Sequence, residues 1–454
     1  MIPSFLLDAM RRSPDDAAVA FRDATHTYSE LLCSIDEWRA RFESAGIRSG
    51  HVTSVEGDYS LDLVAALLCA IDRGCIVTPL SSDSRGTMET LLDTAMVEFR
   101  VDAARRAAEP TGRTAQHELY AELRKRGTAG LVLFSSGSSG KQKAAVHDFD
   151  ALLEKFAAQR HRYRTLLFLQ ADHIGGVNTL FYTLSNSGTI VVPPDRSPSA
   201  VAEIIAHRSV QLLPTSPTFL NLLLLSGEIE RHDLSQLELI TYGTEPMPQS
   251  TLSRLTHALP HVRLQQTYGL TEVGILRSKS QGPESLWVRV GGDGYETRVV
   301  DGRLQIKARS AMLGYLNAPS PFTPDGYFET GDRVEVQGEW LRILGRESEI
   351  INVGGNKVYP AEVEDVLLEI PNVLDVSVYG EPHAITGQIV ACRVRLESDE
   401  PLAAFKSRLR LHCADRLTGY KIPSRVVVTT DPLHSSRFKR MRRVVAAAPS
   451  PGGQ

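Results

Sequence analysis

The feature that most restricts the fold of this chain is a regular alternation of short apolar runs with helix-like segments through residues 1–340. The apolar runs include residues 75–77, 131–134, 166–169, 189–192 and 237–240. Runs of this length, rich in Val, Ile and Leu, are typical of strands buried on both faces, as in parallel sheets. The alternation therefore predicts an α/β architecture with mainly parallel sheets flanked by helices.

Two later segments break this pattern. Residues 288–300 and 304–307 are predicted to be antiparallel strands, because Asp301-Gly302 between them is a favoured two-residue hairpin turn. We expect a small β-barrel-like part here, after the parallel sheets.

A second, smaller unit is predicted from about residue 346. Pro360 suits the first position of a helix, and the apolar residues that follow it have helical spacing. Three strand-like runs come next, at residues 373–379, 389–394 and 424–428. We therefore expect a large N-terminal domain over residues 1–345 and a small mobile α+β domain over residues 346–454.

Composition limits the partners and the location of the protein. The net charge is −4 and the sequence pI is about 6.4, so no nucleic-acid-binding surface is expected. The longest apolar run, Leu63–Ile71, is about half a membrane span and is better explained as a buried helix between Ser60 and Gly74. No secretory signal is visible, and a cytoplasmic location is expected.

The five cysteines show no Cys-x-x-Cys spacing. Cys33, Cys69 and Cys75 lie among apolar residues, and we expect them to be buried thiols in a reducing compartment.

A dense run of small polar residues follows the apolar run at 131–134. It reads Ser135-Ser136-Gly137-Ser138-Ser139-Gly140-Lys141-Gln142-Lys143. Glycines let successive backbone N–H groups converge on an anion, while hydroxyls add donors and lysines add charge. The spacing is not that of the common P-loop, because only two residues separate Gly137 from Gly140. On this stretch alone, a phosphate-binding loop and a flexible Gly/Ser loop explain the pattern about equally well.

Further motifs follow in a fixed order. They are Gly243-Thr244-Glu245, Tyr268-Gly269-Leu270-Thr271-Glu272, Thr330-Gly331-Asp332, Gly345-Arg346 and finally Lys439. Each alone is also explained by ordinary local structure, such as a strand end, a β-turn or a solvated basic tail. Together, over a span from Tyr28 to Arg442, they resemble the adenylate-forming superfamily of acyl- and aryl-CoA synthetases, luciferases and peptide-synthetase adenylation domains.

The resemblance implies that a carboxylate attacks the α-phosphate of ATP to give an acyl-AMP and pyrophosphate, after which a thiol displaces AMP. It also implies site roles. Ser135–Lys143 would bind the β- and γ-phosphates, Glu272 would bind Mg²⁺ and Thr271 the α-phosphate. Tyr268, Gly269 and Gly243–Glu245 would lie beside adenine, Asp332 would bind the ribose hydroxyls, and Arg346 would contact ribose or phosphate. The small domain would rotate just after Arg346, bringing Lys439 for adenylation and residues 352–358 for the second step.

The same resemblance locates the acid and the acceptor. His173 matches the position that closes the acid pocket beside the acceptor tunnel, although a His between a strand and Gly175-Gly176 is often structural. The other expected pocket residues are Val177, Gly243, Val273, Gly274 and Ile275. With no Asp to bind an α-amino group, a fatty, aryl or similar small carboxylic acid is expected. Gly354 and Gly355 would let pantetheine pass close to the backbone.

Four positions depart from the family pattern: Gln142, Ser348, Asn352 and Phe438. Gln142 stands where the family usually has proline, and Ser348 stands at the pivot, where the family usually has Asp or Lys. Both departures are compatible with the family's activity. Asn352 occupies a position that is often lysine in aryl-CoA ligases, and Phe438 stands where glycine usually precedes the catalytic lysine. These last two bear on the second half-reaction more than on the first.

Three functions remain open at this point. The first is activation of an acid followed by transfer to the thiol of CoA or of phosphopantetheine on an acyl carrier protein. The second keeps adenylation but has a non-thiol acceptor, either an amine or, with an oxyacid such as nitrite, an arylamine. The third, a non-catalytic nucleotide-binding protein, is disfavoured by the presence of Glu272, Asp332, Arg346 and Lys439. The sequence indicates neither the individual acid nor the oligomeric state.

Overall fold

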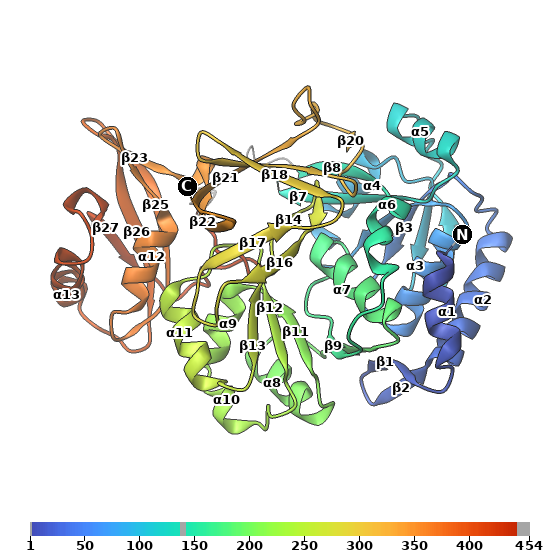
Figure 1. Cartoon of the computed structure of the whole chain (residues 1–454), viewed down its shortest axis with the longest axis horizontal. Helices are drawn as coiled ribbons and strands as arrows, with labels where there is room; N and C mark the ends of the chain where they lie inside the picture. Colours follow the sequence, from blue (N-terminus) through green and yellow to red (C-terminus); the bar gives the residue numbers. More distant parts are fainter. Residues whose placement is uncertain (1, 137–141, 443–454) are drawn as a thin grey trace, which may run out of the picture.

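Figure 1 shows the computed structural model, which describes residues 2–136 and 142–442. The N-terminal elements, in blue and green, form the larger part, and the C-terminal elements, in orange and red, form a smaller part at its side. Within the described residues, no helix combines the length and the apolar character needed to cross a membrane.

Sheet A is mainly parallel, as predicted. Its strands in spatial order are β13 (Arg263–Gln266), β12 (Leu239–Tyr242), β11 (Leu212–Thr215), β9 (Arg164–Leu166), β10 (Thr189–Val192), β1 (Ala17–Phe21) and β2 (Ala24–Thr27). Only the β1–β2 pair is antiparallel. The run predicted at 166–169 ends at Leu166, because the Phe168 N–H donates back to the Leu166 carbonyl and turns the chain out of the sheet.

Sheet B has a parallel centre and antiparallel edges. Its order is β20 (Gly314–Tyr315), β8 (Gln142–Asp148), β7 (Gly130–Ser136), β4 (Ile76–Leu80), β3 (Val52–Glu56), β5 (Phe99–Asp102) and β6 (Ala107–Pro110). Strands β7, β4, β3 and β5 run parallel, and β8 turns back along β7.

Helices fill the space between the two sheets and cover their outer faces. The inner layer consists of α1 (Ser4–Arg12), α2 (Tyr28–Ser44), α3 (Leu61–Asp72), α6 (Phe149–Leu153) and α7 (Ile174–Ser185). Outside sheet A lie α8 (Pro198–His207), α9 (Pro217–Leu225), α10 (Glu228–Arg231) and α11 (Gln249–Ala258), and outside sheet B lie α4 (Met88–Thr94) and α5 (Glu118–Arg126). In β7, Leu131 and Leu133 join the inner core and Val132 the outer one, as the period of a strand requires.

Helix α3 confirms the prediction for the longest apolar run. The Ser60 hydroxyl accepts a hydrogen bond from the Leu63 N–H at 3.2 Å, and Gly74 ends the segment with φ +72°. Cys69 and Cys75 are buried as expected, but the prediction for Cys33 is wrong. Cys33 lies on the face of α2 opposite its buried residues and is exposed.

The third large sheet is antiparallel and corresponds to the expected barrel-like part. Its order is β16 (Arg277–Ser280), β17 (Trp287–Gly291), β22 (Trp340–Arg346), β21 (Phe328–Gln337), β19 (Arg303–Ala308) and β18 (Tyr295–Val300). Asp301 and Gly302 both have positive φ in the β18–β19 turn, as the predicted hairpin requires. The single strand predicted over 288–300 is two strands, because Gly291 and Gly292 adopt positive φ between them.

The C-terminal part has a sheet and a core of its own. The sheet contains β24 (Asn356–Val358), β23 (Ile351–Val353), β26 (Gly387–Leu396), β25 (Val373–His383) and β27 (Arg425–Val428). Helices α12 (Pro360–Leu368) and α13 (Leu402–Ala414) contribute buried residues to this core. The predicted helix and three strands are therefore all present, while a domain boundary at residues 345 and 346 remains a prediction.

Candidate functional site

Thr271 and Glu272 lie at the tip of a small hairpin formed by β14 (Gly269–Leu270) and β15 (Gly274–Ile275). A Cβ atom on Gly269 would come within 2.5 Å of the Ile275 side chain, so only glycine fits this close pairing. The motif is thus a strand end and turn that presents a hydroxyl and a carboxylate side by side.

The Glu272 carboxylate contacts the strands that flank the Ser/Gly run. Its Oε1 accepts hydrogen bonds from the Tyr315 hydroxyl at 2.7 Å and from Ser135 Oγ at 3.3 Å. Ser135 pairs with Lys143 across the β7–β8 hairpin, and the Lys143 ammonium lies 5.1 Å from the centroid of the Tyr315 ring. Among the described residues, Oε2 of Glu272 accepts no hydrogen bond and can bind a cation.

The rest of the Ser/Gly run is only partly described. Ser136 ends β7 and pairs with Gln142 at the start of β8. Gly137, Ser138, Ser139, Gly140 and Lys141 lie outside the described residues.

Asp332 forms a second acidic position near the same hairpin. It accepts a hydrogen bond from the Tyr268 hydroxyl, and its Oδ1 lies 3.5 Å from Arg346 Nε. Burial raises the pKa of Asp332, and the Arg346 cation acts in the opposite direction. Tyr268 is only 7% exposed, so little of its ring is open in this arrangement, and adenine stacking on it remains a prediction.

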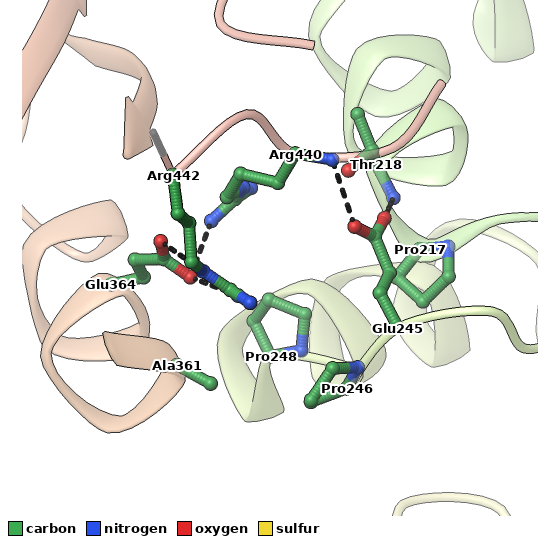
Figure 2. Close-up of a pocket in the computed structure, with 9 residues that line it drawn as sticks. All are labelled: Pro217, Thr218, Glu245, Pro246, Pro248, Ala361, Glu364, Arg440 and Arg442. Atoms are coloured by element: carbon green, nitrogen blue, oxygen red, sulfur yellow. Dashed lines mark hydrogen bonds and ion pairs between the residues drawn. The ribbon is translucent and has the colours of Figure 1, made fainter. Parts of the chain in front are cut away.

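The segment after β12 holds an unusual backbone. A Cβ on Gly243 would lie 2.7 Å from the Thr267 carbonyl, which explains the glycine. Thr244 has φ +75°, a value that β-branched residues rarely adopt and that clusters at functional sites. Glu245 accepts backbone hydrogen bonds from Thr218 at 2.8 Å and from Arg440 at 3.1 Å (Figure 2).

Residues 433–442, here called the closing segment, fold back onto the N-terminal part. The Ser435 N–H donates to the Lys439 carbonyl at 2.9 Å, and Phe438 turns the chain with φ +53°. This left-handed conformation accounts for the glycine usual in the family, since it costs other residues about 1–2 kcal/mol.

Packing offsets that cost at Phe438. Its ring lies 5.2 Å from that of Phe168, 5.4 Å from that of Phe219 and 5.3 Å from that of His434. Aromatic pairs in these arrangements contribute about 0.5–1.5 kcal/mol each beyond their buried area. Its carbonyl also accepts a hydrogen bond from Ser216 Oγ at 2.8 Å.

Charged residues of the closing segment are anchored on both sides of Lys439. Arg437 donates to Asp172, which is 5% exposed, at 2.8 Å. The guanidinium of Arg440 lies 3.3 Å from both Glu364 and Asp375. Arg442 forms a two-pronged pair with Glu364, at 3.0 and 2.7 Å (Figure 2).

These contacts hold Lys439 close enough to the other predicted motifs for their charges to act on it. Burial lowers the pKa of Lys439 to about 8; the cations Arg346 and Arg437 act in the same direction, whereas Glu245 and Glu272 oppose them. Three motifs that are distant in sequence, with Glu245, Glu272 and Arg346, thus act electrostatically on one ammonium group.

His173 caps the start of α7 and lies close to this group. Its Nδ1 accepts a hydrogen bond from the Gly175 N–H at 3.0 Å. Burial, together with the Lys439 and Arg437 cations, lowers the pKa of His173 well below its usual range, so the ring is neutral. Of the expected pocket residues, Val177, Val273 and Gly274 are buried, and Ile275 is half-buried.

The turn expected to meet the acceptor lies elsewhere in this arrangement. Gly354 and Gly355 connect β23 to β24 and are exposed, with φ +56° and +87°. The Gly355 N–H donates to Asn352 Oδ1 at 3.0 Å. The turn geometry alone is therefore sufficient to require both glycines.

Several residues that complete the site carry no motif in the sequence. Tyr315, Asp172 and Glu364 were not predicted as site residues. Tyr315 binds the predicted residue Glu272, whereas Asp172 and Glu364 bind arginines that flank Lys439. Arg437 and Arg440 stand in a visible basic cluster beside Lys439. A signal for the arginines therefore existed, but nothing in the sequence pairs them with acids more than 60 positions away.

Two family models match the chain. One, described as AMP-binding enzyme, matches residues 6–328, and the other, described as AMP-binding enzyme C-terminal domain, matches residues 362–437. The first covers well over half of the chain.

Individual proteins are similar at lower levels of identity. The chain is 26% identical to the long-chain-fatty-acid–CoA ligase FadD13 of Mycobacterium tuberculosis. The match covers 65% of this chain and 63% of that protein, which is less than two thirds of its length. It is 27% identical to the indoleacetate–CoA ligase of Aromatoleum aromaticum over 95% and 94% of the two chains. A crystal structure of the anthranilate CoA ligase AuaEII in complex with anthranoyl-AMP has the same fold, with a TM-score of 0.80, 19% identity and coverage of 96% and 95%.

Proposed function

Because this chain belongs to the family of AMP-binding enzymes, we propose that it activates a carboxylic acid with ATP, releases pyrophosphate and transfers the acyl group to a thiol. The observation that carries this proposal is the position of Lys439. An ordinary basic tail would be solvated, whereas Lys439 is half-buried and its ammonium interacts electrostatically with the acids Glu245 and Glu272 and with the cations Arg346 and Arg437.

Charge explains why such a position is useful. A carboxylate and a triphosphate repel each other, so the enzyme must neutralise charge and hold the attack in line. A long-stemmed ammonium can contact both the attacking carboxylate and the α-phosphate. Ser135, Lys143 and the loop between them would bind the phosphates that leave as pyrophosphate, with the Thr271 hydroxyl at the α-phosphate.

Glu272 and Asp332 would divide the remaining contacts to the nucleotide. The free oxygen of Glu272 fits Mg²⁺, a hard cation that prefers one or two carboxylates in addition to phosphates. When bound, the ion would supply charge neutralisation for the phosphates. Asp332, with Arg346 beside it, would border the ribose.

The acid pocket and the acceptor complete the proposal. Val177, Val273, Gly274 and Ile275 offer an aliphatic lining, which suits a fatty or aryl acid, and His173 would close the pocket as a neutral ring. The thiol acceptor is supported by relatives named as CoA ligases.

The test is pyrophosphate release from ATP with a panel of fatty, aryl and dicarboxylic acids. Product masses are then measured with CoA, an acyl carrier protein or amines as acceptor. We expect release with a subset of acids and a thioester product. Release without any thioester, but with an amide, would replace the thiol by an amine. No release with any acid would contradict the adenylation itself.

A further inference from the structure

Lys155 places an ammonium group next to the proposed acid pocket. It follows α6, and its ammonium donates to the Asn178 side-chain carbonyl and, at 2.8 Å, to the backbone carbonyl of Ile275. Asn178 is adjacent to Val177 on α7, and Ile275 ends β15. The cation therefore joins the two elements from which the pocket lining is proposed.

Among the described residues, no carboxylate pairs with this cation. The neighbouring Glu154 is engaged by Arg309 at 2.9 Å. Burial lowers the pKa of Lys155 to about 7, and the charged neighbours that add to this shift, Arg277 and Arg160, are both cations.

Burying an unpaired charge is costly, and a neutral donor could join α7 to β15 as well. Two of the three ammonium N–H groups are used by neutral acceptors. With its carbonyl turned to Lys155, Asn178 has an amide nitrogen that donates to no described residue. Lys155, Asn178 and Ile275 are all half-buried, so part of each remains open to a ligand.

The position along α7 sets the distance to the reacting centre. His173 caps the helix beside Lys439, and Asn178 lies five residues further on, which is about 7 Å along the axis. In the proposed pocket, Lys155 would therefore stand away from the carboxylate that would attack ATP.

We propose that Lys155, with Asn178, binds a second anionic group of the acid, so that the preferred substrates carry this group about one aryl ring or a chain of about five carbons from the reacting carboxylate. This inference rests on the proposed adenylation and names the substrate class of that same site. Lys155 is a specificity residue here and takes no part in the chemical step.

The test compares matched acids with the full-length enzyme. Benzoic acid is paired with benzene-1,4-dicarboxylic acid, and hexanoic acid with heptanedioic acid; kcat/KM is measured by pyrophosphate release. We expect the wild type to prefer the dicarboxylic member of at least one pair by about tenfold or more. Lys155→Met, which keeps volume and removes charge, should lower kcat/KM for that diacid roughly 10- to 100-fold and change the monoacid less than about threefold.

A charge reversal guards against a variant that merely folds poorly. Lys155→Glu should reject the diacid and gain activity on 4-(aminomethyl)benzoic acid. Equal losses for diacid and monoacid in Lys155→Met, or a wild type that prefers the monoacids, would overturn the inference and leave adenylation intact. If the wild type releases no pyrophosphate with any acid, the proposed function is wrong and this inference falls with it.

Discussion

Among single residues, Lys439 is the one on which the proposed chemistry depends most directly. We expect Lys439→Ala to lower pyrophosphate release by about a hundredfold or more, because the variant loses a charged contact to the transition state. Thioester formation from supplied acyl-AMP should be largely retained. The matched control is Lys125→Ala, on the exposed end of α5. An unchanged release rate in the Lys439 variant would remove this lysine from the mechanism.

The lowered pKa of Lys439 gives a second prediction. The ammonium is charged below its pKa, so activity that needs the charge is complete below about pH 8 and is lost as the pH rises through that value. We expect kcat/KM for ATP, which reports the free enzyme, to fall about tenfold per pH unit above pH 8. In Lys439→Arg the guanidinium stays charged, so a lower but flat profile is expected. The same decline in that variant would point to another group.

Glu272 should control the response to magnesium. Glu272→Gln keeps the shape and one acceptor but loses the charge that would hold the ion. We expect the magnesium concentration for half-maximal pyrophosphate release to rise by about tenfold or more, with an unchanged melting temperature. Tyr315→Phe removes a hydrogen bond to the same carboxylate but not its charge, and should change this concentration far less. A normal titration in Glu272→Gln would mean that the metal is bound elsewhere.

At the scale of elements, the β23–β24 turn separates the two half-reactions. If pantetheine passes beside this turn after a domain rotation, Gly355→Leu should cripple thioester formation and spare pyrophosphate exchange. Because Gly355 has φ +87°, any side chain there also strains the backbone. The control is Gly338→Leu, in another turn with positive φ and open space around it. Equal loss of both half-reactions would contradict the specific role of the turn.

Elements with local signals were predictable from the sequence. The capped helix α3, the Asp301-Gly302 hairpin and the parallel order of β10 and its neighbours depend on short-range patterns. Strand ends were less predictable: the break at Gly291 depends on backbone angles, and the exposure of Cys33 depends on which face of α2 meets the core.

The same distinction holds for the candidate site. Glu272, Asp332 and Lys439 stand in motifs, and the structure brings Glu272 and Lys439 into one electrostatic neighbourhood. The partners Tyr315 and Asp172 could not be predicted, because their contacts join positions that are 43 and 265 residues apart. Phe438 was visible as a departure from glycine, but only its positive φ explains what the glycine is for.

At the scale of the whole molecule, Glu364 connects the closing segment to the C-terminal core. Glu364 is 1% exposed. Burial alone would raise the pKa of its carboxyl group, but the cations Arg442 and Arg440 hold this pKa below its usual range. Glu364→Gln should leave two buried guanidinium groups undercompensated, which costs about 3–5 kcal/mol for a broken buried pair. We expect a lower melting temperature, faster tryptic cleavage between residues 437 and 442, and reduced adenylation.

The pH dependence of this stabilisation has a definite sign. A carboxylate with a lowered pKa in the folded state stabilises the fold at pH values above its pKa in the unfolded chain. It loses that contribution as the pH falls through its pKa in the folded state.

Glu349→Gln is the matched control for Glu364→Gln, since Glu349 also binds Arg442 but is more exposed. Equal tryptic resistance of Glu364→Gln and wild type would show that the network does not hold the closing segment.

The anchoring of the closing segment limits how parts of such enzymes can be exchanged. Three residues of the closing segment contact distant parts of the chain. Arg437 pairs with Asp172, the Phe438 ring packs against Phe168, and the Arg440 N–H donates to Glu245. If the closing segment alone were grafted onto a related protein, its residues would lose the partners that they contact in this chain. The closing segment must therefore be exchanged together with the residues that it contacts. We expect substitutions in the segment and in its contact residues to co-vary.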